Sequence, residues 1–233
     1  MAKTVVIHQP DFRPYVGFFD RSLQTDIYLI LDHVQFVNGT SKAWTHRDRI
    51  KTPKGGQWLA LSVKKSPRDT PINEVELSSE VDWRSANLRL IDANYSRAPF
   101  YREVMPYIEQ LYATPAILLA DFNIKSIALM MELLDVVRPM VRSSELAPVG
   151  SSNELLIDLL RKLGASHYLS GVGARAYMNE QMFLDNGIQV VWQQFNHPVY
   201  PQQFGEFEPY LSAIDMLLNC GIEQSRRLLR EKA

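Results

Sequence analysis

Short apolar runs separated by polar residues organise the start of the chain. Residues 4–8 and 27–31 are the first two such runs, and each is short enough to be a buried strand. Residues 18–25 between them predict a short helix. Because parallel strands joined by a helix end at the same edge of a sheet, we expect the His8 loop and Asp32 to share that edge. Ligands of open α/β sheets bind at such an edge.

The rest of the hydrophobic pattern predicts helices in the middle of the chain and alternating strands and helices in its last third. Apolar residues recur at helical spacing over residues 83–137, whereas residues 34–53 are polar and predict an irregular loop. Residues 72–77 could add a strand, and residues 174–185 a helix. Strands and helices alternate in the last third, which predicts a mostly parallel, Rossmann-like sheet flanked by helices. We therefore expect a single α/β domain over residues 1–233, with a helical segment in the middle of the chain.

Composition narrows the class of protein. The chain is 46% hydrophobic and 22% charged with a formal net charge of -1, so it has no excess of basic residues for binding nucleic acid or a membrane surface. No apolar run approaches the roughly 18 residues of a membrane span, and the start of the chain does not resemble a signal peptide. One cysteine, Cys220, excludes an intrachain disulfide framework. We expect a cytoplasmic protein.

The first candidate site begins where the first predicted strand ends. His8 can donate to a phosphate or act as an acid or base, and Asp32 could bind a sugar hydroxyl, a metal or a catalytic water. We predict that both are catalytic and that Gln9 and Asp11 bind substrate. In the simpler alternative, His8 caps a strand and Asp32 starts a turn.

The second candidate site is basic. Trp44, Arg47 and Arg49 lie in a stretch that also contains a histidine and a lysine. Arginines bind phosphates and carboxylates through two parallel hydrogen bonds, so this predicted loop favours an anionic ligand such as a nucleotide diphosphate. The alternative is a solvated loop in which Asp48 pairs with an arginine.

Two further stretches complete the predicted binding residues. Ser170, Gly171 and Gly173 follow a predicted strand and open a predicted helix, where backbone N–H groups can approach an anion. A dinucleotide fingerprint would need another glycine, and the Gly-x-Ser-x-Gly pattern of a nucleophilic serine is not matched. Near the end of the chain, the predicted binding residues are Tyr200, Gln202, Asp215 and Asn219.

Asp215 and Asn219 are four residues apart and therefore share a helix face. A capping box formed by Ser212 and Asp215 would explain the aspartate without a site. No metal-ligand spacing stands out among the five histidines, so we predict no metal site.

Five stretches together resemble the WbqC-like proteins. They are residues 7–10 (IHQP) with 18–20 (FFD), 31–36 (LDHVQF), 47–50 (RDRI), 168–171 (YLSG), and 211–215 (LSAID) to Asn219. The resemblance covers nearly the whole chain, and Gln35, in the second stretch, joins the predicted substrate-binding residues. It implies a bacterial enzyme of surface-polysaccharide, O-antigen or amino-sugar biosynthesis.

The resemblance also implies a reaction. A transferase of this kind would move an N-acyl or aminoacyl group to a nucleotide-linked amino sugar, with an acyl or aminoacyl thioester on coenzyme A or an acyl carrier protein as donor. His8 would be the general base, Arg47 and Arg49 would hold the diphosphate, and Gly171 and Gly173 would supply backbone donors.

Two other functions remain open. The strand, histidine loop and second strand are also similar to those of nucleotidyltransferases with a His-x-Gly-His motif, although Pro10 and Asp11 replace its last two residues. That alternative predicts nucleotidyl or adenylyl transfer that depends on magnesium and a nucleoside triphosphate. The second alternative is a non-catalytic scaffold of a polysaccharide assembly complex.

Overall fold

The chain is organised in two compact units. The computed structural model describes residues 2–39 and 43–231. The first unit comprises residues 1–9, 20–33 and 137–195, and the second comprises residues 10–19, 34–136 and 196–233. The chain therefore passes between the units five times. This division does not test whether the units fold together, so the single domain stays a prediction.

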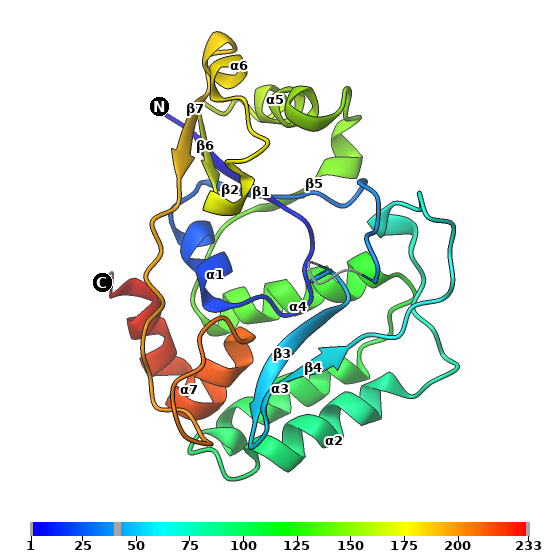
Figure 1. The fold of residues 1–233 in the computed structure, drawn as a ribbon, viewed down its shortest axis with the longest axis vertical. Helices are drawn as coiled ribbons and strands as arrows, with labels where there is room; N and C mark the ends of the chain where they lie inside the picture. The colour runs from blue at the N-terminus through cyan, green and yellow to red at the C-terminus, as the bar shows by residue number, and fades with distance from the viewer. Residues whose placement is uncertain (1, 40–42, 232–233) are drawn as a thin grey trace. The chain divides into compact units, whose positions relative to one another are not determined.

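The first unit is built on a parallel sheet of five strands in the order β5-β2-β1-β6-β7. In this order β1 lies between β2 and β6, and Figure 1 labels the five strands. The strands are β1 (Thr4–His8), β2 (Ile27–Ile30), β5 (Met140–Arg142), β6 (His167–Ser170) and β7 (Gln189–Trp192). The helices of this region are α1 (Val16–Leu23), which crosses the unit boundary, α5 (Ser152–Lys162) and α6 (Glu180–Asp185), with the 3-10 turns η2 (Ser143–Leu146) and η3 (Val172–Ala174).

The strand order creates a switch point beside β1. The chain builds outward from β1 to β2 and β5, then returns to add β6 and β7 on the other side. All four strand pairs are parallel. In an open sheet of this kind, the crevice at the carboxyl ends of the strands that flank the reversal is the usual place for a ligand. Here those strands are β1 and β6.

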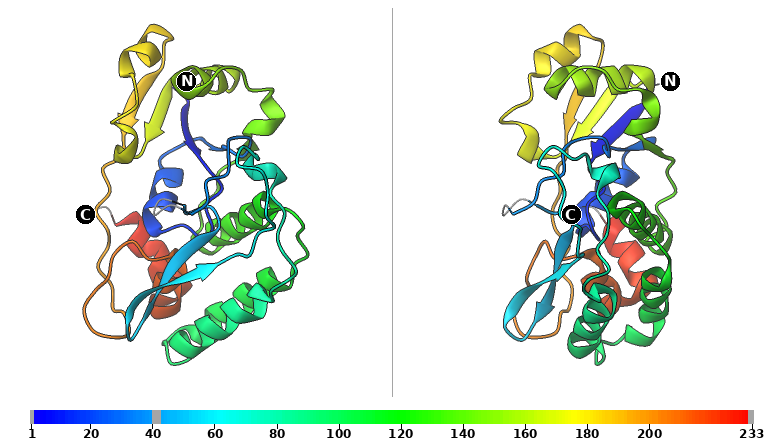
Figure 2. Two further views of the ribbon diagram at one scale, coloured as in Figure 1. Left: turned by 45° about the vertical axis from the view of Figure 1, so that its right-hand side comes forward. Right: turned by 90° about the vertical axis from the view of Figure 1, so that its right-hand side faces the viewer.

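Apolar strands and amphipathic helices form the core of this unit. Val5, Val6 and Leu29 are at most 2% exposed, as expected for parallel strands with both faces covered. The ring of Phe183 on α6 stacks on that of Tyr168 on β6, with their centroids 5.8 Å apart, and Figure 2 shows β6 and β7 running alongside one another. The predicted Rossmann-like sheet flanked by helices is confirmed, as is the helical segment in the middle of the chain.

The second unit combines a hairpin with helices. Its antiparallel hairpin is β3 (Arg47–Thr52) and β4 (Gly55–Ala60), and its helices are η1 (Ile72–Glu74), α2 (Trp83–Tyr95), α3 (Tyr101–Ala113), α4 (Leu119–Leu133) and α7 (Ala213–Arg230). The rings of Trp83, Tyr112 and Phe122 pack against one another at centroid distances of 5.2 to 5.9 Å. These contacts join α2, α3 and α4.

Three local predictions were wrong. Residues 47–52 form β3 instead of an irregular loop, because Gly55 at φ +91° allows the chain to turn and pair with β4. Ile72–Glu74 is a 3-10 turn, not a strand. The helix expected over residues 174–185 begins only at Glu180, where the side chain of Asn179 accepts a bond from Met182 N.

None of the helices in the described part of the chain has the combination of length and apolar character that crossing a membrane requires.

Candidate functional site

The ends of β1 and β6 bring three predicted site residues to one edge of the sheet. Thr4 and Val5 of β1 pair with His167 and Tyr168 of β6. This register carries His8 to the end of β1 on the same side as Ser170 and Gly171 at the end of β6. The switch point of the first unit is therefore lined by His8, Ser170 and Gly171.

Arg21 adds a buried positive charge to this edge. The residue is 7% exposed, and a Cβ atom on Gly171 would lie 2.4 Å from its Nη1 atom. A side chain at position 171 would displace this guanidinium from its observed place. The Nε atom of Arg21 has no hydrogen-bond partner within the described chain. A buried cation with an unsatisfied donor is costly unless an anion approaches it, so this position favours an anionic ligand.

His8 is a neutral imidazole with a defined tautomer. Its Nδ1 atom lies 3.0 Å from the carbonyl oxygen of Gln9, which can only accept, so Nδ1 carries the proton and Nε2 the lone pair. Burial and the charge of Arg21 lower the pKa of His8 to about 3. An anion bound at Arg21 would weaken the second effect and make Nε2 a better base.

Asp20 links helix α1 to the residue that follows β7. Its Oδ2 atom accepts hydrogen bonds from Gln193 Nε2 at 2.7 Å and from Gln24 Nε2 at 2.8 Å. Gln193 is buried, and its backbone N–H donates to the carbonyl oxygen of Ser170. Helix α1 is thereby joined to the segment that follows β7. Sequence reasoning missed Arg21 and Gln193, because neither belongs to a motif and both depend on residues far away in the chain.

Asp32 holds two strand ends in place. Its side chain is fully buried and accepts four hydrogen bonds, from Arg142 Nε at 2.7 Å, Ser143 Oγ at 3.0 Å, and Ser144 N and Oγ at 3.0 and 2.8 Å. Burial alone would raise the pKa of Asp32, but these bonds outweigh it and lower the pKa. With about four acceptor positions on a carboxylate, Asp32 is suited to joining the end of β2 to β5 and η2.

We expect Asp32→Asn to destabilise the protein by roughly 2 to 4 kcal/mol at neutral pH, because a charged acceptor is lost and one amide donor faces other donors. The folded pKa of Asp32 lies below its unfolded value. Its contribution to stability is therefore present above the unfolded pKa and is lost as the pH falls through the folded pKa. Urea unfolding of both proteins should show a gap that narrows in acid. An equal gap at neutral and acid pH would contradict this.

The basic stretch lies on the β3–β4 hairpin of the second unit. The guanidinium of Arg47 lies 4.3 Å from the centre of the Trp58 ring, and Trp44 packs on the same tryptophan at 5.4 Å. Arg49 Nη1 lies 3.4 Å from Glu208 Oε1. The structure thus groups Trp44, Arg47 and Arg49, and their binding of a diphosphate stays a prediction.

Two other predicted residues also lie in the second unit. Gln35 is exposed, and its Nε2 atom donates to the carbonyl oxygen of Arg68 at 2.7 Å. Asp11 is near enough to Asp48 for its charge to help burial raise the pKa of Asp48. Neither contact places Gln35 or Asp11 with His8.

Asp215 is the centre of a buried network in the second unit. Its oxygens accept hydrogen bonds from Tyr95 Oη at 2.6 Å and from Tyr200 Oη and Gln202 Nε2, both at 2.9 Å. Asn219 Nδ2 donates to the Asp215 carbonyl oxygen at 2.8 Å. The four predicted residues of this stretch do meet, and Tyr95 was missed.

This network anchors the segment before α7. The Oε1 atom of Gln202 accepts a hydrogen bond from Lys51 Nζ at 3.0 Å, and Lys51 also donates to the carbonyl oxygen of Glu206. The predicted capping box is wrong, because the Asp215 carboxylate is taken by other donors and Ser212 Oγ donates to the Arg13 carbonyl oxygen. Burial raises the pKa of Asp215 against the effect of its hydrogen bonds.

Gly173 differs from Gly171 in its surroundings. It lies in the short turn η3, and a Cβ atom there would meet no atom within 4 Å. Because only the three-residue turn η3 follows Gly171 and α6 begins at Glu180, the helix that this stretch was predicted to open is absent. Binding of an anion by its backbone N–H groups stays a prediction. In the described residues, no group of three or more histidine, cysteine, aspartate or glutamate side chains is placed to hold a metal ion.

Comparisons with known proteins give one family model and one curated relative. The model of the WbqC-like protein family matches residues 9–227. The chain is also 30% identical to "Uncharacterized protein Rv1507c" of Mycobacterium tuberculosis (strain ATCC 25618 / H37Rv) over 223 residues, which are 95% of each chain. The comparison with solved structures gave no match.

Proposed function

The chain belongs to the WbqC-like protein family, and from this premise we propose that it is a cytoplasmic bacterial transferase of surface-polysaccharide or amino-sugar biosynthesis. It transfers an acyl or aminoacyl group to the amine of a nucleotide-linked amino sugar. The donor is a thioester on coenzyme A or on an acyl carrier protein.

The observation that carries this proposal is the position of Arg21. Its buried guanidinium has an unpartnered Nε atom and lies against the backbone of Gly171 at the switch point of the sheet. A phosphate of the nucleotide would satisfy this charge, because arginine forms strong charge-assisted hydrogen bonds with phosphate oxygens. The sugar would then lie toward His8, whose Nε2 atom carries the lone pair.

His8 acts as the general base on this proposal. The amine of the sugar attacks the thioester carbonyl carbon, a C–N bond forms, and the C–S bond breaks. The proton leaves the amine for His8 Nε2 and passes from there to the departing sulfur. Binding of the anionic nucleotide raises the pKa of His8 from its resting value of about 3 by offsetting the charge of Arg21. Asp32 supports this edge as a positioning residue.

A second candidate function is supported by the strand order. The arrangement β5-β2-β1-β6-β7, with a histidine at the end of β1, also suits a nucleoside triphosphate bound at the same edge. Nucleotidyl or adenylyl transfer would then require magnesium, whereas acyl transfer would not depend on a triphosphate.

A thermal-shift screen of nucleotide sugars, nucleoside triphosphates with magnesium, and acyl-coenzyme A compounds tests these alternatives. A ligand at about 100 times its Kd adds about 2.7 kcal/mol to the stability of the folded state. We expect nucleotide-linked amino sugars to raise the Tm of the wild type. Arg21→Gln and Gly171→Ala should lose this shift relative to their own ligand-free Tm. Arg102→Gln, at an exposed arginine of α3, is the matched control.

Measuring the rate of thiol release distinguishes a loss of catalysis from a loss of ligand binding. With an acyl-coenzyme A and a nucleotide amino sugar that both bind, His8→Ala should keep the thermal shift but release free thiol about 10² to 10⁴ times more slowly. Stabilisation by triphosphates alone would overturn the acyl-transfer proposal. If no small ligand stabilises the protein, the enzyme proposals fail and the scaffold function is favoured. The diphosphate contacts of Arg47 and Arg49 are tested by repeating the screen on their glutamine variants.

A further inference from the structure

A pocket of about 380 Å³ opens beside residues 64–70 in the second unit. Its volume lies within the range of about 300 to 1,000 Å³ that is typical of small-molecule sites. The lining residues are Phe36, Asn38, Val63, Lys64, Lys65, Ser66, Pro67 and Arg68. None of the predicted site residues lines this pocket, although Gln35 is adjacent to it in sequence.

Residues 64–70 form a loop along the pocket, and main-chain hydrogen bonds hold both of its ends. On one side Val63 forms an antiparallel bridge with Leu77, and Lys64 N donates to the carbonyl oxygen of Glu76 at 2.8 Å. On the other side Phe36 N donates to the Thr70 carbonyl oxygen at 2.9 Å. The loop between these anchors is therefore a fixed wall with defined ends.

The Gln35 side chain supports the same wall. Its Nε2 atom donates to the Arg68 carbonyl oxygen at 2.7 Å, and its backbone forms an antiparallel bridge with Pro71. Within the loop, Thr70 N donates to the Pro67 carbonyl oxygen at 3.2 Å, which closes a tight turn. This turn places Arg68 at the wall of the pocket.

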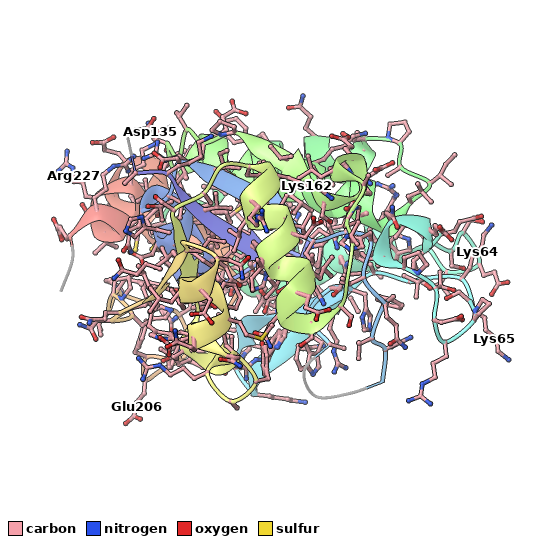
Figure 3. The ribbon with its side chains drawn as sticks, turned by 90° about the horizontal axis from the view of Figure 1, so that it is seen from above. Lys64, Lys65, Asp135, Lys162, Glu206 and Arg227 are labelled. Atoms are coloured by element: carbon pink, nitrogen blue, oxygen red, sulfur yellow. The ribbon has the colours of Figure 1, made fainter. Side chains whose placement is uncertain are left out.

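The pocket has a local excess of positive charge. Three of its lining residues are cationic and none is acidic, although the whole chain has a net charge of -1. Lys64 is paired with Glu76, with 2.5 Å between Nζ and Oε2. Lys65 and Arg68 are exposed, and no ion pair joins either of them to an acid within the described chain. Figure 3 shows Lys64 and Lys65 on the outer edge of the loop.

The rest of the lining offers a second kind of contact. Phe36 is 8% exposed and forms an apolar part of the wall with Val63 and Pro67, whereas Ser66 and Asn38 contribute polar groups. Small-molecule sites typically combine apolar lining with a few charged or polar groups. Both kinds of lining are present here.

We propose that this pocket binds a phosphomonoester of a small organic molecule, with Lys65 and Arg68 on the phosphate and Phe36 against the organic part. Arginine offers a planar pair of donors to phosphate oxygens, and lysine adds a point charge. This site lies in the second unit, shares no residue with the Arg21 site, and goes beyond the proposed transferase activity.

NMR titration of the ¹⁵N-labelled full chain tests the proposal. Uridine monophosphate and glucosamine 6-phosphate are the probes, and uridine and glucosamine are their matched controls without phosphate. We expect at least one phosphorylated probe to shift the amide signals of residues 63–68 to saturation, with an affinity about tenfold or more above that of its control. The tighter probe identifies the organic part that Phe36 accepts.

Two variants test whether ligand binding in the NMR titration depends on the charges of Lys65 and Arg68. The double change Lys65→Ala with Arg68→Ala should weaken binding by about tenfold or more, and because both side chains are exposed the fold should persist. Lys54→Ala removes an exposed lysine of the hairpin outside the pocket and should leave the affinity unchanged. Equal binding by the double variant, equal binding of phosphorylated and unphosphorylated probes, or no saturable shift in residues 63–68 would overturn the proposal.

The Arg21 site can be scored separately in the same spectra. Arg21→Gln should remove any ligand-induced shift at residues 8–9 and 170–173 while leaving the shifts at residues 63–68. In the wild type, ligand-induced shifts at only one of these two sets of residues would show which of the two proposals has failed.

Discussion

Replacing Gly221 by alanine is expected to lower the free energy of unfolding by about 3 kcal/mol. Gly221 lies inside α7 at φ +76° and ψ 171°, a region of backbone conformation that is essentially limited to glycine. A Cβ atom there would lie 2.5 Å from the Cδ1 atom of Phe100 and 2.9 Å from Oε2 of Glu103. The variant must therefore strain the kink of α7 and displace the side chains of Phe100 and Glu103. Urea unfolding of the wild type and the variant measures the loss.

Gly187→Ala is the matched control for this experiment. Gly187 also has a positive φ, of +72°, but a Cβ atom on it would meet nothing within 4 Å. We expect this variant to lose about 1 kcal/mol, the cost of the left-handed conformation without a clash. If both variants lose the same amount, neither the backbone conformation of Gly221 nor the close approach of Phe100 adds to the cost of a side chain there.

Asp215→Ala is expected to cost about 3 to 5 kcal/mol. The change leaves Tyr95, Tyr200 and Gln202 without the acceptor that they share. All of these donors lie in or beside the core, so water cannot readily replace the carboxylate. Thermal and urea unfolding should both show the loss. Amide signals near Gln202 should broaden in NMR spectra, because the segment before α7 loses its anchor.

The stability losses of two milder variants can be compared with that of Asp215→Ala. Asp215→Asn keeps one acceptor oxygen and should lose less than the alanine variant. Tyr95→Phe removes a single hydrogen bond from the network and should cost about 1 kcal/mol. An alanine variant no less stable than Tyr95→Phe would show that the network is not a structural anchor.

The parallel sheet could be predicted because its strands are buried on both faces. Residues 4–8 and 27–30 are almost continuously apolar, and such runs between polar breaks indicate buried parallel strands. The end of each strand follows from the first polar residue, which is why His8 and Asp32 could be placed at one edge. Sequence separation was no obstacle there, since β1 and β2 are neighbours in the chain.

Arg21 could not be identified as a site residue from the sequence, because its role depends on a residue far away in the chain. In the sequence it is an ordinary basic residue near the end of a short helix, a place where such residues are common. Its significance depends on Gly171, which is 150 residues away in the chain, and on the absence of a side chain there. No local pattern contains that information.

The hairpin was missed because its strands do not look like strands. Residues 47–52 (RDRIKT) are mostly charged or polar, yet Asp48, Lys51 and Thr52 are buried. Lys51 is satisfied by distant partners, because Tyr95 Oη accepts from its backbone N–H and Gln202 Oε1 accepts from its Nζ. The same kind of long-range partner overrode the local capping signal at Asp215.

The place of β6 in the sheet has a consequence for synthesis of the protein. Strand β1 can pair with β2 as soon as the first thirty or so residues have left the ribosome, but its other neighbour begins at His167. Closing such a long loop costs entropy that local pairing does not. The nascent chain therefore has His8 and Arg21 early but lacks the β6 side of the crevice until most of its length has been made. We expect a ribosome-bound chain that stops short of β6 to expose an unpaired edge of β1 and to be a substrate for chaperones.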